Sequence, residues 1–232
     1  MTDLLFDTPA IPSIPVNGET AQYPIHRIFC IGRNYAAHAA EMGNQVDREA
    51  PFFFTKSPAS AVLSGASVPY PQGTTNYHHE MELAIAIGAP LFECTLEQAR
   101  AGVYAYGCAL DMTRRDLQLK ERAKKYPWSA GKDVENSAVF APLTKADAFG
   151  DITNQRIHLS VNGQIRQDAD LTELIWSLDE ILVHMSALYH LVPGDLIMTG
   201  TPAGVGAVVA GDVLTGGIDG LDPIRLTLTA AQ

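Results

Sequence analysis

The chain has 232 residues and a formal charge of −10, with 16 Lys and Arg residues against 26 Asp and Glu residues. So acidic a chain lacks the basic stripe that neutralises phosphates, and we expect no nucleic-acid partner. The apolar fraction of 47% is enough for a sizeable core, and the length fits one large domain or one domain with an arm.

The cysteines and the hydrophobic pattern indicate the cellular compartment in which the protein is expected. Cys30, Cys94 and Cys108 are odd in number and show no CxxC spacing, which is typical of buried thiols in a reducing environment. No apolar run is long enough to cross a membrane, and residues 1–7 lack the basic start of a secretory signal. We therefore expect a cytoplasmic protein with no membrane partner.

The predicted elements begin with a proline-rich segment. Four prolines within residues 1–24 predict an extended N-terminal arm, and residues 25–232 then form one domain. Residues 27–32 predict a strand that ends in a glycine turn, residues 35–42 a short helix, and residues 51–56 a second strand.

His38 and Glu41 lie three residues apart on the short helix, hence on one face. A carboxylate beside an imidazole fixes its tautomer and raises its basicity, as a water-activating base requires. For this pair alone, a surface salt bridge is the alternative. We expect the helix and the polar loop of residues 43–50 to be mobile without ligand and ordered over a bound acid.

Glu80 and Glu82 open an apolar stretch that predicts a strand, stopped by Gly88. Because side chains alternate along a strand, the two glutamates share one face with Ala84 and Ala86, and the larger apolar residues share the other. Two carboxylates one pleat repeat apart repel each other unless solvent or a cation intervenes. The pattern therefore predicts either a solvent-facing strand with surface acids or a cation site.

Asp111 supplies a third carboxylate at the end of another apolar stretch, residues 103–110. An acid at the end of a buried strand has a fixed backbone, which favours a site. Three carboxylates without a Cys/His ligand set suit Mg²⁺ or Mn²⁺, with Ca²⁺ possible in a crystal, rather than zinc.

Two helices and many short strands complete the chain. Thr113 with Asp116 predicts a capped helix that ends by Pro127, and Ser177 with Glu180 predicts a capping box that opens an amphipathic helix. The remaining segments are short strands separated by turn residues. We therefore predict an α+β fold that is predominantly β, and not a parallel βαβ array.

The glycine-rich segment of residues 199–206 is neither a Walker motif nor a dinucleotide fingerprint. It lacks GK[ST], and Pro202 lies where a phosphate-binding helix would have to begin. A tight turn that lets backbone and a hydroxyl approach a small ligand fits the segment, and a purely structural loop is the alternative.

Several of these segments follow one another in a recognisable order over residues 25–225. They are Gly32-Arg33-Asn34-Tyr35 with His38 and Glu41, Phe54-Thr55-Lys56, His79-Glu80-Met81-Glu82-Leu83, residues 110–118, Lys132 and residues 199–206. In this combination they resemble the fumarylacetoacetate hydrolase family, and within it the acylpyruvase branch.

The resemblance implies a mixed β-sandwich roll with short peripheral helices, usually assembled as a homodimer. It implies that Glu80, Glu82 and Asp111 bind Mg²⁺ or Mn²⁺, that His38 and Glu41 activate water, and that Lys132 acts at the substrate. It also implies that Lys56, Arg115, Gln118 and Thr201 line the pocket, and we add Arg33, Tyr35 and Gly200 as substrate-binding candidates.

The chain departs from the family pattern at two places. Ser57 follows Lys56 where the family usually has Pro, and Asp133 and Val134 follow Lys132 in place of a small or apolar pair. An acid beside Lys132 would raise its pKa or pull it away from the substrate.

These residues fit the hydrolysis of the carbon–carbon bond of a 2,4-diketo acid. We favour fumarylpyruvate, cleaved to fumarate and pyruvate, because it carries an anion at each end. Arg33, Lys56 and Arg115 are candidate partners for the distal carboxylate, for which a bidentate arginine is the strongest option. Acetylpyruvate hydrolysis and oxaloacetate decarboxylation or tautomerisation are alternatives on the same site, and a non-catalytic β scaffold is a distant one.

Overall fold

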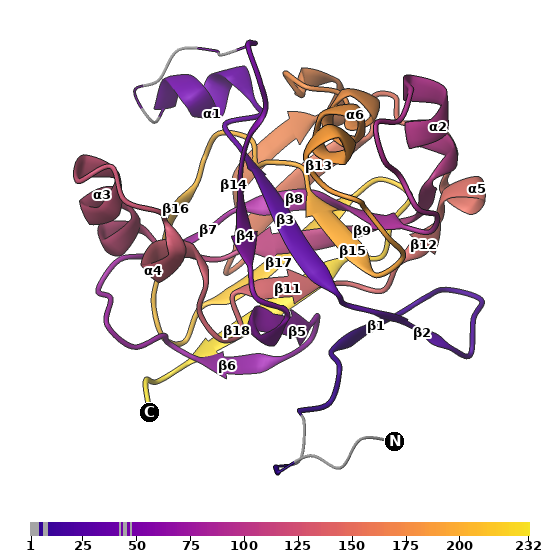
Figure 1. Cartoon of the computed structure of the whole chain (residues 1–232). Coiled ribbons are helices and arrows are strands. Elements are labelled where there is room, and N and C mark those ends of the chain that lie inside the picture. Colours follow the sequence, from indigo (N-terminus) through magenta and orange to yellow (C-terminus); the bar gives the residue numbers. More distant parts are fainter. Residues whose placement is uncertain (1–4, 7–8, 42, 44–45, 47) are drawn as a thin grey trace.

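The computed structural model describes residues 5–6, 9–41, 43, 46 and 48–232. In this part of the chain the strands form the body and the helices lie at its periphery, as Figure 1 shows. The strands are β1 Ser13–Pro15, β2 Gln22–Pro24, β3 Arg27–Gly32, β4 Phe52–Lys56, β5 Ala61–Leu63, β6 Ser67–Pro69, β7 Tyr77–His79, β8 Met81–Ile87, β9 Val103–Asp111, β10 Thr113–Arg114, β11 Ala138–Phe140, β12 Thr144–Lys145, β13 Arg156–Val161, β14 Gln164–Asp170, β15 Asp195–Met198, β16 Gly206–Val208, β17 Val213–Ile218 and β18 Ile224–Thr229. The helices are α1 Ala36–Glu41, η1 Pro58–Ser60, α2 Leu96–Ala101, α3 Arg115–Ala123, α4 Ser129–Lys132, α5 Ala146–Phe149, η2 Leu171–Glu173 and α6 Leu178–Leu188.

Two sheets make up most of the body. The larger sheet has the order β4-β3-β15-β8-β9-β11-β5, with β12 pairing beside β9. The smaller sheet has the order β14-β13-β17-β18-β6, and a separate three-stranded ribbon joins β10, β7 and β16. The predominantly β, α+β class predicted from the sequence is confirmed.

Strand β8 carries the main core between the sheets. Its larger side chains, Met81, Leu83, Ile85 and Ile87, are fully buried in one apolar cluster with residues of β13 and β17. Ala84 and Ala86 belong to a second cluster on the opposite face of the sheet. The alternation predicted for this strand is therefore confirmed, and it turns Glu82 to the side of the small residues.

The N-terminal segment covers that second face. Strands β1 and β2 pair as an antiparallel hairpin, which buries Ile14, Val16 and Tyr23 against the sheet. The Tyr23 hydroxyl lies 2.8 and 2.9 Å from the carbonyl oxygens of Ile87 and Asp195, between which its single proton is shared. Residues 13–24 thus form a packed hairpin, and the division of the chain at residue 24 stays a prediction.

The two predicted helix starts have different outcomes. At Ser177 the capping box is present, with Ser177 Oγ accepting from the Glu180 amide at 3.3 Å. Thr113 is not a helix cap, because it lies in β10 and α3 begins at Arg115. Asp116 instead accepts a hydrogen bond from the Thr74 hydroxyl at 2.6 Å, which ties the preceding loop to the helix.

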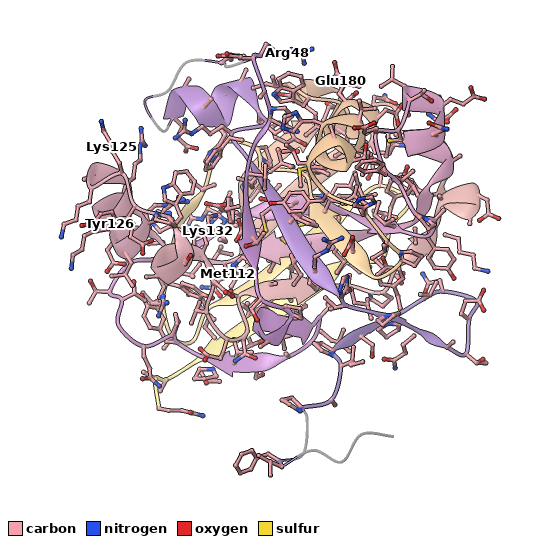
Figure 2. The ribbon with its side chains drawn as sticks, viewed as in Figure 1. Arg48, Met112, Lys125, Tyr126, Lys132 and Glu180 are labelled. Atoms are coloured by element: carbon pink, nitrogen blue, oxygen red, sulfur yellow. The ribbon has the colours of Figure 1, made fainter. Side chains whose placement is uncertain are left out.

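The predicted mobile loop is described only in part. Residues 44, 45 and 47 lie outside the described residues, so its mobility stays a prediction. Arg48, which follows, reaches Glu180 at 3.0 Å, and both residues are labelled in Figure 2. Its guanidinium lies 4.3 Å from the centroid of the Trp176 ring. No helix in the described part of the chain is long and apolar enough to span a membrane.

Candidate active site

Glu80, Glu82 and Asp111 meet where two central strands come together. Glu80 lies between β7 and β8, Glu82 lies in β8, and Asp111 ends β9, which pairs antiparallel with β8. The Asp111 amide donates to the Glu80 carbonyl at 2.9 Å, which fixes the relative position of the two residues. One carboxylate oxygen from each residue lies within 4.8 Å of the others, and all three side chains are buried. The solvent-facing alternative is thereby excluded.

Two buried cations already contact Glu80. Lys132 from α4, labelled in Figure 2, donates to Glu80 Oε2 at 2.7 Å. It also reaches Asp111 Oδ2 at 2.6 Å and the Thr113 hydroxyl at 2.7 Å. The Arg115 guanidinium binds Glu80 Oε1. Burial alone would raise the pKa of Glu80, but Lys132 and Arg115 together hold that pKa below its ordinary value.

The pKa of Glu82, unlike that of Glu80, is raised in the folded protein. Its Oε2 accepts from the Gly200 amide at 2.8 Å, yet it forms no ion pair with any described Lys, Arg or His. Burial raises the pKa of Glu82 well above its ordinary value, and the neighbouring charges of Asp111 and Glu80 add to this. A buried carboxylate without a cationic partner is costly, and a bound metal ion would remove that cost.

Asp111 also keeps an unsatisfied oxygen. Lys56 Nζ lies 3.0 Å from Asp111 Oδ1, but this oxygen accepts no hydrogen bond. The ammonium directs its three donors elsewhere, to the Met112 carbonyl at 3.1 Å, to Ser137 Oγ at 2.8 Å and to the Lys132 carbonyl. The orphan oxygen and the all-carboxylate donor set fit a hard divalent cation.

The predicted contact between the His38 imidazole and the Glu41 carboxylate is present. His38 Nδ1 and Glu41 Oε2 lie 3.1 Å apart on α1, and the His38 side chain is buried. The two Glu41 oxygens also accept from the Gly204 amide at 3.2 and 3.3 Å. Glu41 therefore connects the helix to the glycine-rich segment, and the pair is more than a surface salt bridge.

Most of the predicted site residues line one pocket. The residues that do so are Arg33, His38, Glu80, Glu82, Asp111, Arg115, Gln118, Lys132 and Thr201. The free volume is about 40 Å³, which holds water or a metal ion, so a larger acid requires side chains at the rim to move. Lys56 is buried behind Asp111 and does not line this pocket, and the Tyr35 hydroxyl is buried without a partner.

The glycine-rich segment of residues 199–206 positions Glu82 through a backbone hydrogen bond. Gly200 has φ +101°, and a Cβ at this position would lie 2.7 Å from Asn34 Cβ, so the backbone needs glycine to bring its amide to Glu82. The Thr201 hydroxyl accepts from Gln167 Nε2 at 2.7 Å. Gln167 is fully buried on β14, so the smaller sheet holds the segment in place.

Comparison with known proteins gives the same assignment as the site. The model of the fumarylacetoacetate (FAA) hydrolase C-terminal family matches residues 27–229. The chain belongs to the fumarylacetoacetate hydrolase family. The resemblance that its motifs predicted is confirmed.

Several characterised family members are similar over most of their length. The fumarylpyruvate hydrolase of Ralstonia sp. is 50% identical over 194 residues, which cover 82% of this chain and 100% of that protein. The mitochondrial oxaloacetate decarboxylase of Dictyostelium discoideum is 39% identical over 197 residues, which cover 84% of this chain and 90% of that protein. Among solved structures, fumarylpyruvate hydrolase from Pseudomonas aeruginosa in complex with Mn²⁺ and pyruvate superimposes with a TM-score of 0.94 at 43% identity, covering 98% of this chain and 100% of that one.

The family motifs leave three notable residues unaccounted for. Arg122 and Trp128 line the pocket, and Gln167 supports it from the other sheet. Arg122 follows Gln118 by four residues on α3, so helical spacing was a signal that could have found it. Trp128 and Gln167 had no such local signal.

Proposed function

We propose that the protein is a metal-dependent hydrolase that cleaves fumarylpyruvate to fumarate and pyruvate. The observation that carries this proposal is the buried carboxylate cluster, with its unpaired Glu82 and the orphan oxygen of Asp111, in one pocket with His38. The 50% identity to the Ralstonia enzyme supports the substrate assignment. The similarity to a structure with Mn²⁺ and pyruvate supports the choice of metal and the kind of product.

Glu80, Glu82 and Asp111 are the proposed metal ligands, for Mg²⁺ or Mn²⁺. When bound, the metal would supply Lewis-acid stabilisation of the negative charge that develops on the pyruvate portion as the carbon–carbon bond breaks. The protein contributes a rigid ligand set, since Glu82 and Asp111 come from two paired central strands and the Glu80 backbone is hydrogen-bonded to the Asp111 amide.

His38 and Glu41 are the proposed base that activates water. Hydrogen bonding of Nδ1 to Glu41 leaves His38 Nε2 as the ring nitrogen that takes a proton from water in the pocket. The Glu41 carboxylate stabilises the imidazolium that results. General-base help supplies about 10²–10⁴-fold, so the base works together with electrostatic stabilisation at the other end of the substrate.

Lys132, Arg115, Gln118 and Thr201 are proposed to contact the keto-acid end. Lys132 and Arg115 place two positive charges beside Glu80, and both residues line the pocket. A bound carboxylate or enolate would take up hydrogen bonds that these side chains now give to the protein's own acids. Tyr35 and Gly200 would act indirectly, by shaping the turn and by orienting Glu82.

A comparison of substrates tests this function. We expect wild-type protein loaded with Mn²⁺ to release pyruvate from fumarylpyruvate with a higher kcat/KM than from acetylpyruvate. We also expect it to convert oxaloacetate more slowly, although the similarity to oxaloacetate decarboxylase makes this the second candidate activity. A higher kcat/KM for oxaloacetate or acetylpyruvate would reject the fumarylpyruvate assignment and keep the metal-centred one.

We also propose that the protein is a cytoplasmic homodimer. Both large sheets have edge strands, β4 and β5 in one and β14 and β6 in the other, and such edges favour pairing or coverage by a partner. The three cysteines are free and buried, as expected in a reducing compartment. A monomeric mass by light scattering at micromolar concentration would refute the dimer.

A further inference from the structure

One face of α3 runs along the pocket from its depth toward its mouth. Arg115, Gln118 and Arg122 are spaced by three and four residues, and all three line the pocket. Arg115 and Gln118 are 4% and 5% exposed, whereas Arg122 is only half-buried. Arg122 therefore lies nearer to solvent than the two residues beside the carboxylates.

The length of this helical face suits the proposed substrate. Seven residues of α-helix separate Arg115 from Arg122, a rise of about 10 Å. Fumarylpyruvate has seven carbons in a row, and its six bonds of ~1.5 Å give an extended zigzag about 8 Å long, because each bond advances the chain by about 1.3 Å. With the keto acid held at the carboxylate cluster, the distal carboxylate would arrive near Arg122.

Arg33, which directly follows β3, lines the same pocket as Arg122. It has φ +60°, a conformation that is uncommon for a residue with a side chain and is often retained at functional sites. Its guanidinium lies 5.3 Å from the centroid of the Phe52 ring and 5.7 Å from that of Trp128. These aromatic faces orient the cation by attraction to their π-systems.

An aromatic wall connects the two ends of the pocket. At the deep end, Lys132 Nζ lies 4.9 Å from the centroid of Phe54. Phe54 is 5.9 Å from Trp128, and Trp128 is 4.8 Å from Phe52, measured between ring centroids. The wall thus passes from the cation beside the carboxylates to Arg33, and it offers an apolar surface to the carbon chain between two anionic ends.

The other two cations suggested by the sequence lie at the carboxylate end of the site. Lys56 directs its donors to Met112, Ser137 and Lys132, and it does not line the pocket. Arg115 binds Glu80 and Gln118. Both lie at the carboxylate cluster, where the keto-acid end of the substrate belongs.

We infer that Arg33 and Arg122 form a clamp for the distal carboxylate, with Phe52 and Trp128 holding Arg33 in place. The inference rests on the proposed function for the position of the keto-acid end. It makes the two arginines the residues that select a diacid such as fumarylpyruvate over a monoacid such as acetylpyruvate. The two arginines come from different elements, the end of β3 and α3, and a planar guanidinium can give paired hydrogen bonds to a carboxylate.

The kinetic test compares two substrates that differ at the distal end. Arg122→Ala removes one arginine, and Arg33→Asn removes the other with a residue that tolerates a positive φ. We expect each variant to lower the ratio of kcat/KM for fumarylpyruvate over acetylpyruvate by tenfold or more, on the order of a lost charged hydrogen bond. Lys120→Ala, which removes an exposed cation from the same helix outside the pocket, should keep the wild-type ratio. A ratio within twofold of wild type in both arginine variants would overturn the clamp.

A binding test separates this inference from the proposed function. The Mn²⁺-loaded protein is titrated with 2-oxoheptanedioate and with 2-oxoheptanoate, which share a keto-acid head and length and differ only in the distal carboxylate. We expect tighter binding of the diacid to wild type, and a tenfold or greater loss of that preference in Arg122→Ala and Arg33→Asn. If wild type cleaves neither acylpyruvate but keeps this arginine-dependent preference, the hydrolase proposal fails and the clamp stands. If it cleaves fumarylpyruvate but shows no preference, or one that survives both substitutions, the clamp fails.

Discussion

The ammonium of Lys132 lies 2.6 Å from Asp111 Oδ2, inside the cluster of carboxylates proposed to bind the metal. It therefore serves as an internal counter-ion for acids that are removed from water. Burial would lower the pKa of Lys132, but Asp111 and Glu80 outweigh this effect and raise it, so the side chain is charged in the folded protein. A metal ion and this ammonium would compete for the same carboxylate oxygens.

Replacing Lys132 by Met should therefore affect the metal-free protein most. Loss of a buried counter-ion leaves uncompensated carboxylates, and we expect Lys132→Met to reduce the free energy of unfolding by about 3–5 kcal/mol without metal. Added Mn²⁺ should restore much of that stability. Thermal unfolding with and without Mn²⁺ measures both effects, and an equal loss in the two conditions would contradict the counter-ion role.

Gln167 should control the glycine-rich segment from the opposite sheet. Its side chain donates to Thr201 Oγ1 at 2.7 Å and to the Pro202 carbonyl at 2.9 Å, and it accepts from the Met81 amide at 3.0 Å. Gln167→Ala leaves these buried groups unsatisfied, at about 1–3 kcal/mol for each group left without a partner. Urea unfolding should show this loss, whereas Gln164→Ala, at an exposed position on the same strand, should be close to wild type.

Two glycines with similar backbone angles allow the cost of a left-handed backbone to be distinguished from the cost of a steric clash of an added Cβ. Gly200 and Gly211 have φ +101° and +96°, but a Cβ at Gly200 meets Asn34 at 2.7 Å, while at Gly211 it meets nothing within 4 Å. We expect Gly211→Ala to cost about 1–2 kcal/mol from the left-handed backbone alone. Gly200→Ala should cost more and should also weaken Mn²⁺ binding, because its amide would move from Glu82. Equal destabilisation by the two substitutions, with unchanged Mn²⁺ affinity, would argue against the role of the glycine-rich segment in positioning Glu82.

Ionisation of the Cys108 thiol should make the folded protein less stable as the pH rises above 9. Burial raises the pKa of Cys108 from 9.0 to about 12. Below pH 9 the thiol is protonated in both states, so its contribution is fully present there. Between pH 9 and 12 only the unfolded chain ionises, and stability should fall by about 1.4 kcal/mol per pH unit from this group. Urea unfolding from pH 8 to 11 should show a shallower decline for Cys108→Ala than for wild type, and parallel declines would refute the assignment.

The sequence predicted the parts of the site that depend on local pattern. Strand alternation placed Glu82 on the face of the small side chains, and the end of an apolar stretch marked Asp111 as a third carboxylate with a fixed backbone. Helical spacing paired His38 with Glu41. Each of these depends on one element, whose geometry is fixed by the chain around it.

The remaining contacts depend on how distant segments pair. Gln167 precedes Thr201 by 34 residues in the sequence. Its side chain reaches the site because it lies on β14, the edge strand of the second sheet. Lys56 was predicted to contact substrate, yet the pairing of β4 with β3 directs its ammonium behind Asp111. Thr113 looked like a helix cap, but its pairing with His78 makes it part of a strand. Such pairings between distant segments cannot be read from local sequence.

Titration of metal-free protein with Mn²⁺ by isothermal calorimetry tests the central claim most directly. The proposed site predicts one Mn²⁺ per chain in wild type, and affinity reduced by at least an order of magnitude in Glu82→Ala, which removes the carboxylate that has no other cationic partner among the described residues. Glu97→Ala, which removes an exposed acid of α2 outside the pocket, should bind Mn²⁺ as wild type does. Unchanged affinity in Glu82→Ala would contradict the assignment of the metal centre.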